Sequence, residues 1–171
     1  PTVDVDFMAD RISRDRDFLA HVFQEILGIV CDEDGVSFDV NSIKLEPITV
    51  EKKYPGTRFY FTAHMDTIAY NMSVDIGFGD AVVPRPEEMV YPTLLGLDET
   101  RLLAYSKESV IAEKFQAMVY LAEGNSRMKD FFDVYTILKS GKVDNGLLKE
   151  AVVEVFANRG TNADPDSVVF S

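Results

Sequence analysis

The chain has 171 residues, enough for one domain or two small ones. Its 46% hydrophobic and 27% charged residues are ordinary for a globular core, and no apolar run approaches the roughly 18 residues that a membrane span needs. The net charge of −12 argues against a protein that coats nucleic acid nonspecifically, because that kind of binding needs many Lys and Arg contacts to phosphate.

Cysteine and histidine are too scarce for the common soft-metal sites. The single cysteine, Cys31, excludes an internal disulfide and a CxxC motif, and it fits a reducing cytosol, so we expect a cytoplasmic protein. His21 and His64 are too few and too scattered for a zinc site. The chain begins at Pro1, without methionine and directly before a candidate strand, so we expect that its true start is missing.

The first half of the chain is predicted to be strands with one helix. In residues 13–29 apolar residues recur at helical spacing, with Ser13 as the expected N-cap and Gly28 as the stop. Asn41 and Ser42 are expected to separate two strands. Alternation of apolar and polar residues predicts strands at 2–8, 36–40, 42–50, 57–65 and 71–80.

The second half changes character. Three prolines between residues 84 and 92 predict a linker, and helical patterns follow at 107–124, 126–141 and 145–160. Strands followed by helices indicate an α+β fold, with a mixed or antiparallel sheet and a helical C-terminal bundle. We expect an α/β core over residues 1–96 and a helical domain over 97–171.

The stretch "TVDVDF" places two acids on one face of a strand. Asp4 and Asp6 alternate with Val3, Val5 and Phe7, so both carboxylates point the same way. They either lie on the wet face of a half-buried strand or hold Mg²⁺, which binds through one or two carboxylates plus substrate phosphates. Asp75, in a later strand, has the same two interpretations, and three such acids could hold two cations for phosphoryl chemistry.

Lys114 interrupts the apolar stripe of the helix predicted at 107–124. It either extends to the surface or faces a cleft that holds an anion such as phosphate. The next helix opens with Arg127, Lys129, Asp130 and Asp133, and helix starts favour anions. Those acids could equally complement the helix dipole, and Lys129 and Asp133 could form an exposed i,i+4 pair.

Several segments together resemble one family. "TVDVDF", "VDIGFGD", "YPTLLGL" and residues 104–138 resemble the abortive-infection nucleotidyltransferase toxins of the AbiEii/AbiGii type, whose core is similar to DNA polymerase β-type nucleotidyltransferases. The resemblance runs from residue 2 to about 160 and is strongest at "ESVIAEK" and "NSRMKDFFD". It implies a polymerase β-like core and a toxin of a bacterial toxin–antitoxin or phage-defence system.

The resemblance also implies roles for individual residues. Asp4 and Asp6 match the metal-binding acid pair, and Asp75 matches a third strand acid, so these three are the expected ligands of Mg²⁺ or Mn²⁺. Lys114 and Asp130 match the late-motif lysine and acid. The expected nucleotide contacts are Lys114, Arg127 and Lys129; no role is assigned to Glu113 or Asp133.

The implied reaction moves a nucleoside monophosphate from an NTP to a hydroxyl of an RNA, such as a tRNA, or of a protein. An antitoxin is the implied partner, and no membrane is involved. The family's glycine-serine or glycine-glycine loop, which precedes the acid pair and holds the nucleotide phosphates, is not present upstream of Asp4 in this sequence. Two alternatives remain: a non-catalytic interaction module on the same fold, and a small-molecule nucleotidyltransferase of the antibiotic-modifying kind.

Overall fold

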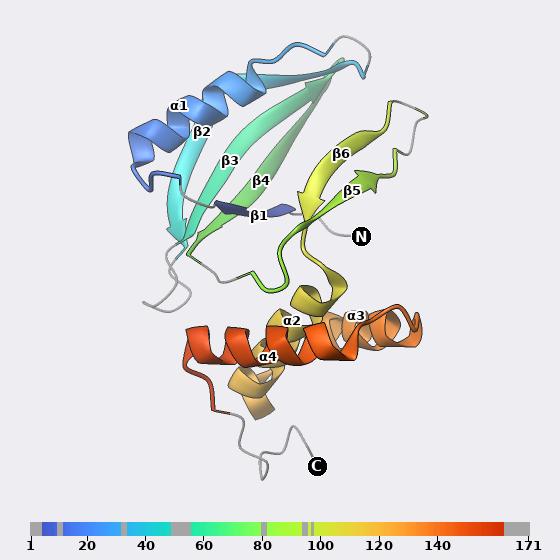
Figure 1. Cartoon of the computed structure of the whole chain (residues 1–171). Helices are drawn as coiled ribbons and strands as arrows, with labels where there is room; N and C mark the ends of the chain where they lie inside the picture. Colours follow the sequence, from blue (N-terminus) through green and yellow to red (C-terminus); the bar gives the residue numbers. More distant parts are fainter. Residues whose placement is uncertain are drawn as a thin grey trace. The chain divides into compact units, whose positions relative to one another are not determined.

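The computed structural model describes residues 5–9, 12–31, 34–48, 56–79, 82–93, 96 and 98–162. The chain divides into two compact units, residues 1–80 and 81–171, each with both strands and helices (Figure 1). The predicted α+β class and mixed sheet are therefore confirmed. The expected boundary at 96/97 falls inside the second unit, between its two strands. Among the described helices, none has the length and apolar character to cross a membrane.

A four-stranded sheet with one helix on one of its faces forms the first unit (Figure 1). The strands lie in the order β1-β4-β3-β2; β1 runs parallel to β4, and the other neighbours are antiparallel. The elements are β1 (Val5–Ala9), α1 (Arg16–Leu27), β2 (Val36–Ile48), β3 (Gly56–Met65) and β4 (Ile68–Phe78). The predicted strand residues 2–4 lie outside the described residues.

Buried apolar side chains occupy alternate positions along β3 and β4, and they form the core beneath α1. Successive strand side chains point to opposite faces, so one face of the sheet is apolar and the other polar. The ring of Phe59 is fully buried and stacks on Phe23 of α1, with 3.9 Å between ring centroids. The buried residues of this core are Leu19, Leu27, Phe59, Phe61, Val74, Ile76 and Phe78.

The predicted break at Asn41 and Ser42 is a bulge within one long strand. From Asp39 to Lys44 β2 advances five positions while β3 advances two, from Thr62 to Tyr60, so β2 carries three additional residues. An odd number of added residues reverses the alternation of side chains. Phe38 and Leu45 consequently face the same core although one position is even and the other odd.

Ser42 stabilises that bulge with its hydroxyl. Its Oγ donates to the carbonyl of Asp39 at 2.7 Å and accepts from the backbone N–H of Thr62 at 2.8 Å. The side chain therefore replaces a backbone partner that the bulge removes from the ladder. Residues that read as a turn in the sequence thus interrupt the register without ending the strand.

The start of α1 differs from the prediction by two residues. Asp15, not Ser13, is the N-cap, and its carboxylate accepts the N–H of Phe18 at 2.9 Å. Ser13 instead accepts the N–H of Asp15, at 3.2 Å. The predicted stop at Gly28 is confirmed as the C-cap.

The second unit begins with a β-hairpin that was not predicted from the sequence. The linker prediction was wrong for the stretch Glu87–Tyr91, which forms β5 and pairs antiparallel with β6 (Thr100–Ala104). Prolines 84, 86 and 92 flank β5 and do not interrupt it, so they leave its backbone N–H groups intact. The helices that follow are α2 (Lys107–Leu121), the short 3₁₀ turn Ala122–Gly124, α3 (Met128–Lys139) and α4 (Asn145–Arg159).

Helix α2 contacts both α3 and α4, and some of its buried side chains are polar. Ala112 of α2 and Ala151 of α4 are both fully buried, and their small side chains allow the two helices to approach closely. Ser106 caps α2 by accepting the N–H of Ser109 at 3.0 Å. Buried Glu108 accepts the N–H of Asp144, the N-cap of α4, at 2.9 Å, so α2 orients the start of α4.

Replacing Phe59 with alanine tests the core of the first unit. Because the ring is fully buried against Phe23, we expect F59A to lower the free energy of unfolding by about 3–5 kcal/mol. Urea denaturation followed by circular dichroism measures this change. F18A, on the exposed side of α1, is the control and should cost under about 1 kcal/mol. Equal losses in the two variants would contradict the assignment of the core.

Candidate functional site

Asp6 and Asp75 occupy paired positions on neighbouring strands. In the parallel pairing of β1 with β4 these two residues are direct Cα partners, so both side chains lie on the same face of the sheet. That face is opposite to the α1 core, because Val74 and Ile76, the neighbours of Asp75, are buried in the core. Two of the three predicted strand acids of the first unit are therefore adjacent.

Arg58 lies on the other side of Asp75. It is the antiparallel partner of Asp75 in β3, and its guanidinium makes a two-pronged ion pair with both carboxylate oxygens. Nε donates to Oδ1 and Nη2 to Oδ2, each at 2.6 Å. The hydrogen bond to Asp75, followed by one to Tyr60, raises the pKa of Arg58 above its ordinary value, so the guanidinium stays charged throughout the physiological range.

The third predicted metal ligand, Asp4, lies outside the described residues. Within the residues that are described, no group of three or more His, Cys, Asp or Glu side chains could hold a metal ion. The Asp6 and Asp75 carboxylates nonetheless fit a hard cation in chemistry, because Mg²⁺ takes oxygen ligands and often uses one or two protein carboxylates. These two residues are the described candidates for holding such an ion.

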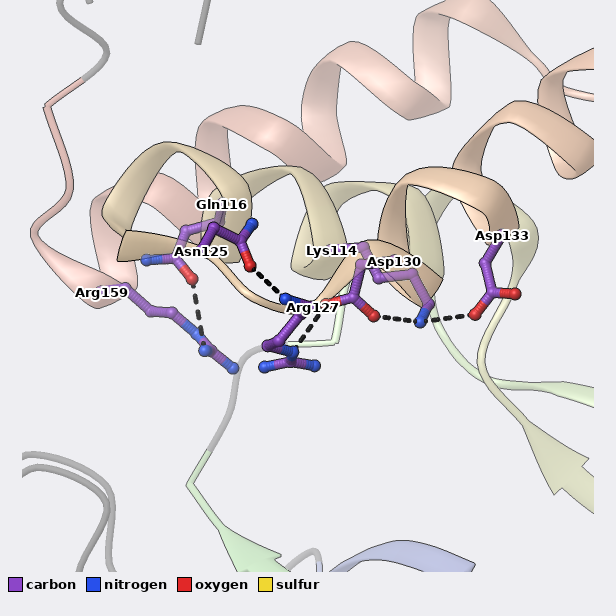
Figure 2. Close-up of polar contacts among 7 residues, drawn as sticks. All are labelled: Lys114, Gln116, Asn125, Arg127, Asp130, Asp133 and Arg159. Carbon is purple, nitrogen blue, oxygen red and sulfur yellow. Dashed lines mark hydrogen bonds and ion pairs between the residues drawn. The ribbon is translucent and has the colours of Figure 1, made fainter. Parts of the chain in front are cut away.

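Lys114 belongs to a second charged group, within the second unit. Its Nζ lies 2.7 Å from Oδ1 of Asp130 and 2.9 Å from Oδ2 of Asp133, so one ammonium bridges two carboxylates (Figure 2). The Lys114 side chain is 22% exposed, so α2 holds it against α3 and it does not extend into water. Burial alone would lower the pKa of Lys114, but the hydrogen bonds to Asp130 and Asp133 raise it above its ordinary value.

Asp130 is the most buried acid of this group. Its side chain is 5% exposed, and its Oδ2 lies 2.7 Å from Nε of Arg127, which is an ion-pair distance although the contact lacks hydrogen-bond geometry. Arg127 immediately precedes α3, and its backbone N–H donates to Oδ1 of Asn125 at 2.8 Å. The segment before α3 is thereby folded so that two cations flank Asp130 (Figure 2).

Polar contacts extend from α2 to the end of α4. Buried Gln116 donates from Nε2 to the hydroxyl of Thr161 at 2.7 Å. It also accepts from Nη1 of Arg159 at 3.3 Å (Figure 2). Arg159 also forms an ion pair with Glu113. These bonds fix the helix that carries Lys114, so the ammonium is presented from a rigid element.

The predicted site residues fall into two groups, one in each unit. Asp6 and Asp75 meet in the first unit, and Lys114, Arg127 and Asp130 meet in the second. Lys129 is exposed in the first turn of α3. The expectation that Lys114 faces the strand acids stays a prediction, as do the roles assigned to each residue.

Two partners of these groups were not identified from the sequence. Asp133 was recognised as an acid that could pair with Lys129, but its contact with Lys114, at 2.9 Å, was not foreseen. Arg58 was not singled out. Its position between Thr57 and Phe59 in an alternating strand places it on the polar face, but only the β3–β4 register sets it opposite Asp75.

A family model described as nucleotidyl transferase AbiEii toxin, type IV toxin–antitoxin system, matches residues 1–170. The chain belongs to the AbiEii family. The resemblance drawn from the sequence motifs is therefore confirmed over essentially the whole chain. Membership assigns it, at the level of the family, to nucleotidyltransferases that are toxins, and it implies an antitoxin partner. Neither the curated proteins nor the solved structures yielded a match.

Replacing Lys114 with methionine tests the charged group of this AbiEii chain. Methionine preserves the apolar stem but leaves buried Asp130 with Arg127 as its remaining cation, so we expect a loss of about 2–3 kcal/mol in the free energy of unfolding. Denaturant titration measures it. The matched control is R101M, which breaks an exposed 2.9 Å pair with Glu88 and should cost at most about 1 kcal/mol. A K114M effect no larger than that of R101M would contradict the burial argument.

The raised pKa of Lys114 gives this stabilisation a defined pH dependence. A group whose pKa is higher in the folded than in the unfolded state stabilises the fold fully below its unfolded pKa. The difference in stability between wild type and K114M should therefore be constant around neutral pH and shrink as the pH rises above 10.5, the ordinary lysine value. Denaturation at a series of alkaline pH values measures it, and a difference that grows with pH would contradict the assignment.

Proposed function

We propose that the chain is a Mg²⁺-dependent nucleotidyltransferase toxin that transfers a nucleoside monophosphate from an NTP to a hydroxyl of an RNA or a protein. The observation that carries the proposal is the β1–β4 register, which pairs Asp6 with Asp75 in a chain of a nucleotidyltransferase family. Adjacent carboxylates on a rigid sheet provide fixed oxygen ligands, and phosphoryl transfer depends mainly on such positioning and on electrostatics.

Asp6, together with Asp4 and Asp75, is proposed to hold the cation. A bound Mg²⁺ would supply positive charge at the phosphates and at the attacking oxygen. The paired strands keep Asp6 and Asp75 at a fixed spacing, so little reorganisation is needed when a nucleotide enters. Asp75 is also proposed to orient the acceptor hydroxyl, because its side chain is 17% exposed and still reaches solvent.

Lys114 is proposed to offset charge on the triphosphate. Its ammonium already binds two carboxylate oxygens, at 2.7 Å and 2.9 Å, so phosphate oxygens are chemically suitable replacements. Asp130 is proposed to hold Lys114 in place, and Arg127 and Lys129 are proposed to contact the nucleotide. In the proposed setting the toxin acts in the cytoplasm and is opposed by its antitoxin.

A non-catalytic interaction module is the second candidate, and one observation favours it. Asp75 and Lys114 are each paired inside their own unit, so both charges are satisfied without any substrate. A structural ion pair and a resting catalytic pair look alike in this respect. Activity measurements on variants distinguish the two candidates.

Replacing Asp6 with asparagine tests the proposed transfer. Loss of a metal ligand costs several kcal/mol of transition-state stabilisation, so D6N should reduce Mg²⁺-dependent transfer by about a hundredfold or more. The assay follows label from each of the four α-labelled NTPs into total RNA, purified protein and small-molecule acceptors. D75N should have an effect of the same kind.

The matched control is D17N, which removes an exposed acid in the first turn of α1 and should retain full transfer. Absence of transfer by the wild-type chain with every NTP and acceptor would favour the non-catalytic module. Transfer only to small molecules would favour the antibiotic-modifying type of enzyme. Transfer that survives in D6N and D75N would contradict the proposed cation site.

A further inference from the structure

We propose that Arg58 is a positioning residue that holds the Asp75 carboxylate as an internal counter-ion and thereby weakens divalent-cation binding beside Asp6. The inference rests on the proposed function, since it assumes that this pair of acids is the cation site. It assigns to Arg58 a role that opposes cation binding, and it predicts that removing the charge of Arg58 strengthens the binding of a divalent cation.

The geometry of the pair is that of a fixed clamp. Both Arg58 donors reach Asp75 at 2.6 Å, one to each oxygen, and the two residues are direct partners across β3 and β4. A two-pronged contact orients the plane of the carboxylate as well as its position. The direction in which the remaining lone pairs of Asp75 point is therefore set by Arg58.

The remaining lone pairs leave room for a cation. An ionised carboxylate has about four lone-pair sites, and the two prongs of the guanidinium use one on each oxygen. Asp75 can therefore bind Arg58 and a metal at once, with Asp6 contributing from the neighbouring strand. The arginine need not leave for the ion to enter.

The charges nonetheless oppose each other. Four side chains at paired positions form a row across the sheet, namely Glu46, Arg58, Asp75 and Asp6. Arg58 is the cation of this row. It already neutralises Asp75, which is the register partner of Asp6. A divalent ion held by Asp75 is repelled by Arg58 from a few ångströms away. Solvent screens part of this repulsion, because the Arg58 side chain is 40% exposed, but the Asp75 carboxylate is only 17% exposed.

Without a bound ion the same contact stabilises the sheet. Asp6 and Asp75 are like charges at a directly paired position, which is unfavourable in a sheet. Arg58 relieves that repulsion in the absence of metal. A bound cation would relieve the same repulsion between the two acids. Because Arg58 already does so in the metal-free state, the free energy gained on metal binding is smaller.

The test compares cation binding by the full wild-type chain with that by R58Q, R58K and D75N. Glutamine keeps a hydrogen-bond donor and removes the charge, whereas lysine keeps the charge and loses the two-pronged geometry. Binding of Mn²⁺ is measured by electron paramagnetic resonance without nucleotide, and thermal denaturation is recorded with and without Mg²⁺. The matched control is R101Q, which removes an arginine from an exposed pair with Glu88 on a different sheet.

We expect R58Q to bind Mn²⁺ about tenfold more tightly than wild type, because repulsion from one unit charge at this range is about that strong. R58K keeps the repelling charge and loses only the two-pronged orientation of the carboxylate, so it should not share this gain and should stay within about threefold of wild type. Mg²⁺ should raise the melting temperature of R58Q more than that of wild type. R101Q should bind Mn²⁺ as tightly as wild type does. The double variant D75N/R58Q should lack the tighter binding of R58Q. If R58Q does not fold, R58M, which also removes the charge but keeps an apolar stem, replaces it, and tighter Mn²⁺ binding by R58M than by R58K supports the proposal.

Several results would overturn the inference. One is equal or weaker Mn²⁺ binding by R58Q. Another is an R58Q variant in which only the KM for NTP increases, because that result would make Arg58 a phosphate contact. Absence of Mn²⁺ binding in every variant would also overturn it. Because binding is measured without nucleotide, tighter binding by R58Q in a chain that transfers no label would uphold the role of Arg58 while refuting the proposed reaction.

Discussion

The arrangement of the first unit depends on β4, which pairs with β3 on one side and with β1 on the other. Its antiparallel contact with β3 sets Arg58 against Asp75, and its parallel contact with β1 sets Asp6 against the same residue. The opposite face of β4 carries Val74, Ile76 and Phe78 into the core under α1. Because a strand alternates strictly between faces, burying those apolar residues fixes where the acid must point. The hydrophobic core and the polar row are thus two consequences of one register.

In the second unit, α2 has the corresponding role. Buried Glu108 and buried Gln116 bind the segments around it, and Lys114 faces α3. Polar groups buried without partners are costly, so each of these side chains specifies the position of the element it contacts. The result in both units is the same: an ionisable residue of interest is held in a strong pair on a rigid element.

The elements that the sequence predicted well are those with long, regular patterns. Gly28 ended α1 as expected, and the three helices of the second unit begin within two residues of the predicted positions. The predictions failed where local signals competed with tertiary pairing. Asn41 and Ser42 read as a strand break, but Ser42 bonds across to Thr62 and keeps β2 continuous. The prolines around β5 read as a linker, but they flank the paired residues of the strand and leave its pairing with β6 intact.

The sequence by itself determined the family, the α+β class, the facing of Asp6 and Asp75 on polar sides of their strands, and the unusual place of Lys114 in an apolar stripe. These follow from residue order and from the fixed periods of strands and helices. Only the tertiary structure decided that Arg58 clamps Asp75 and that Asp133 and Asp130 share Lys114. Those partners are separated by 16 to 19 positions along the chain. Their meeting depends on strand register and helix packing, and no local period encodes either.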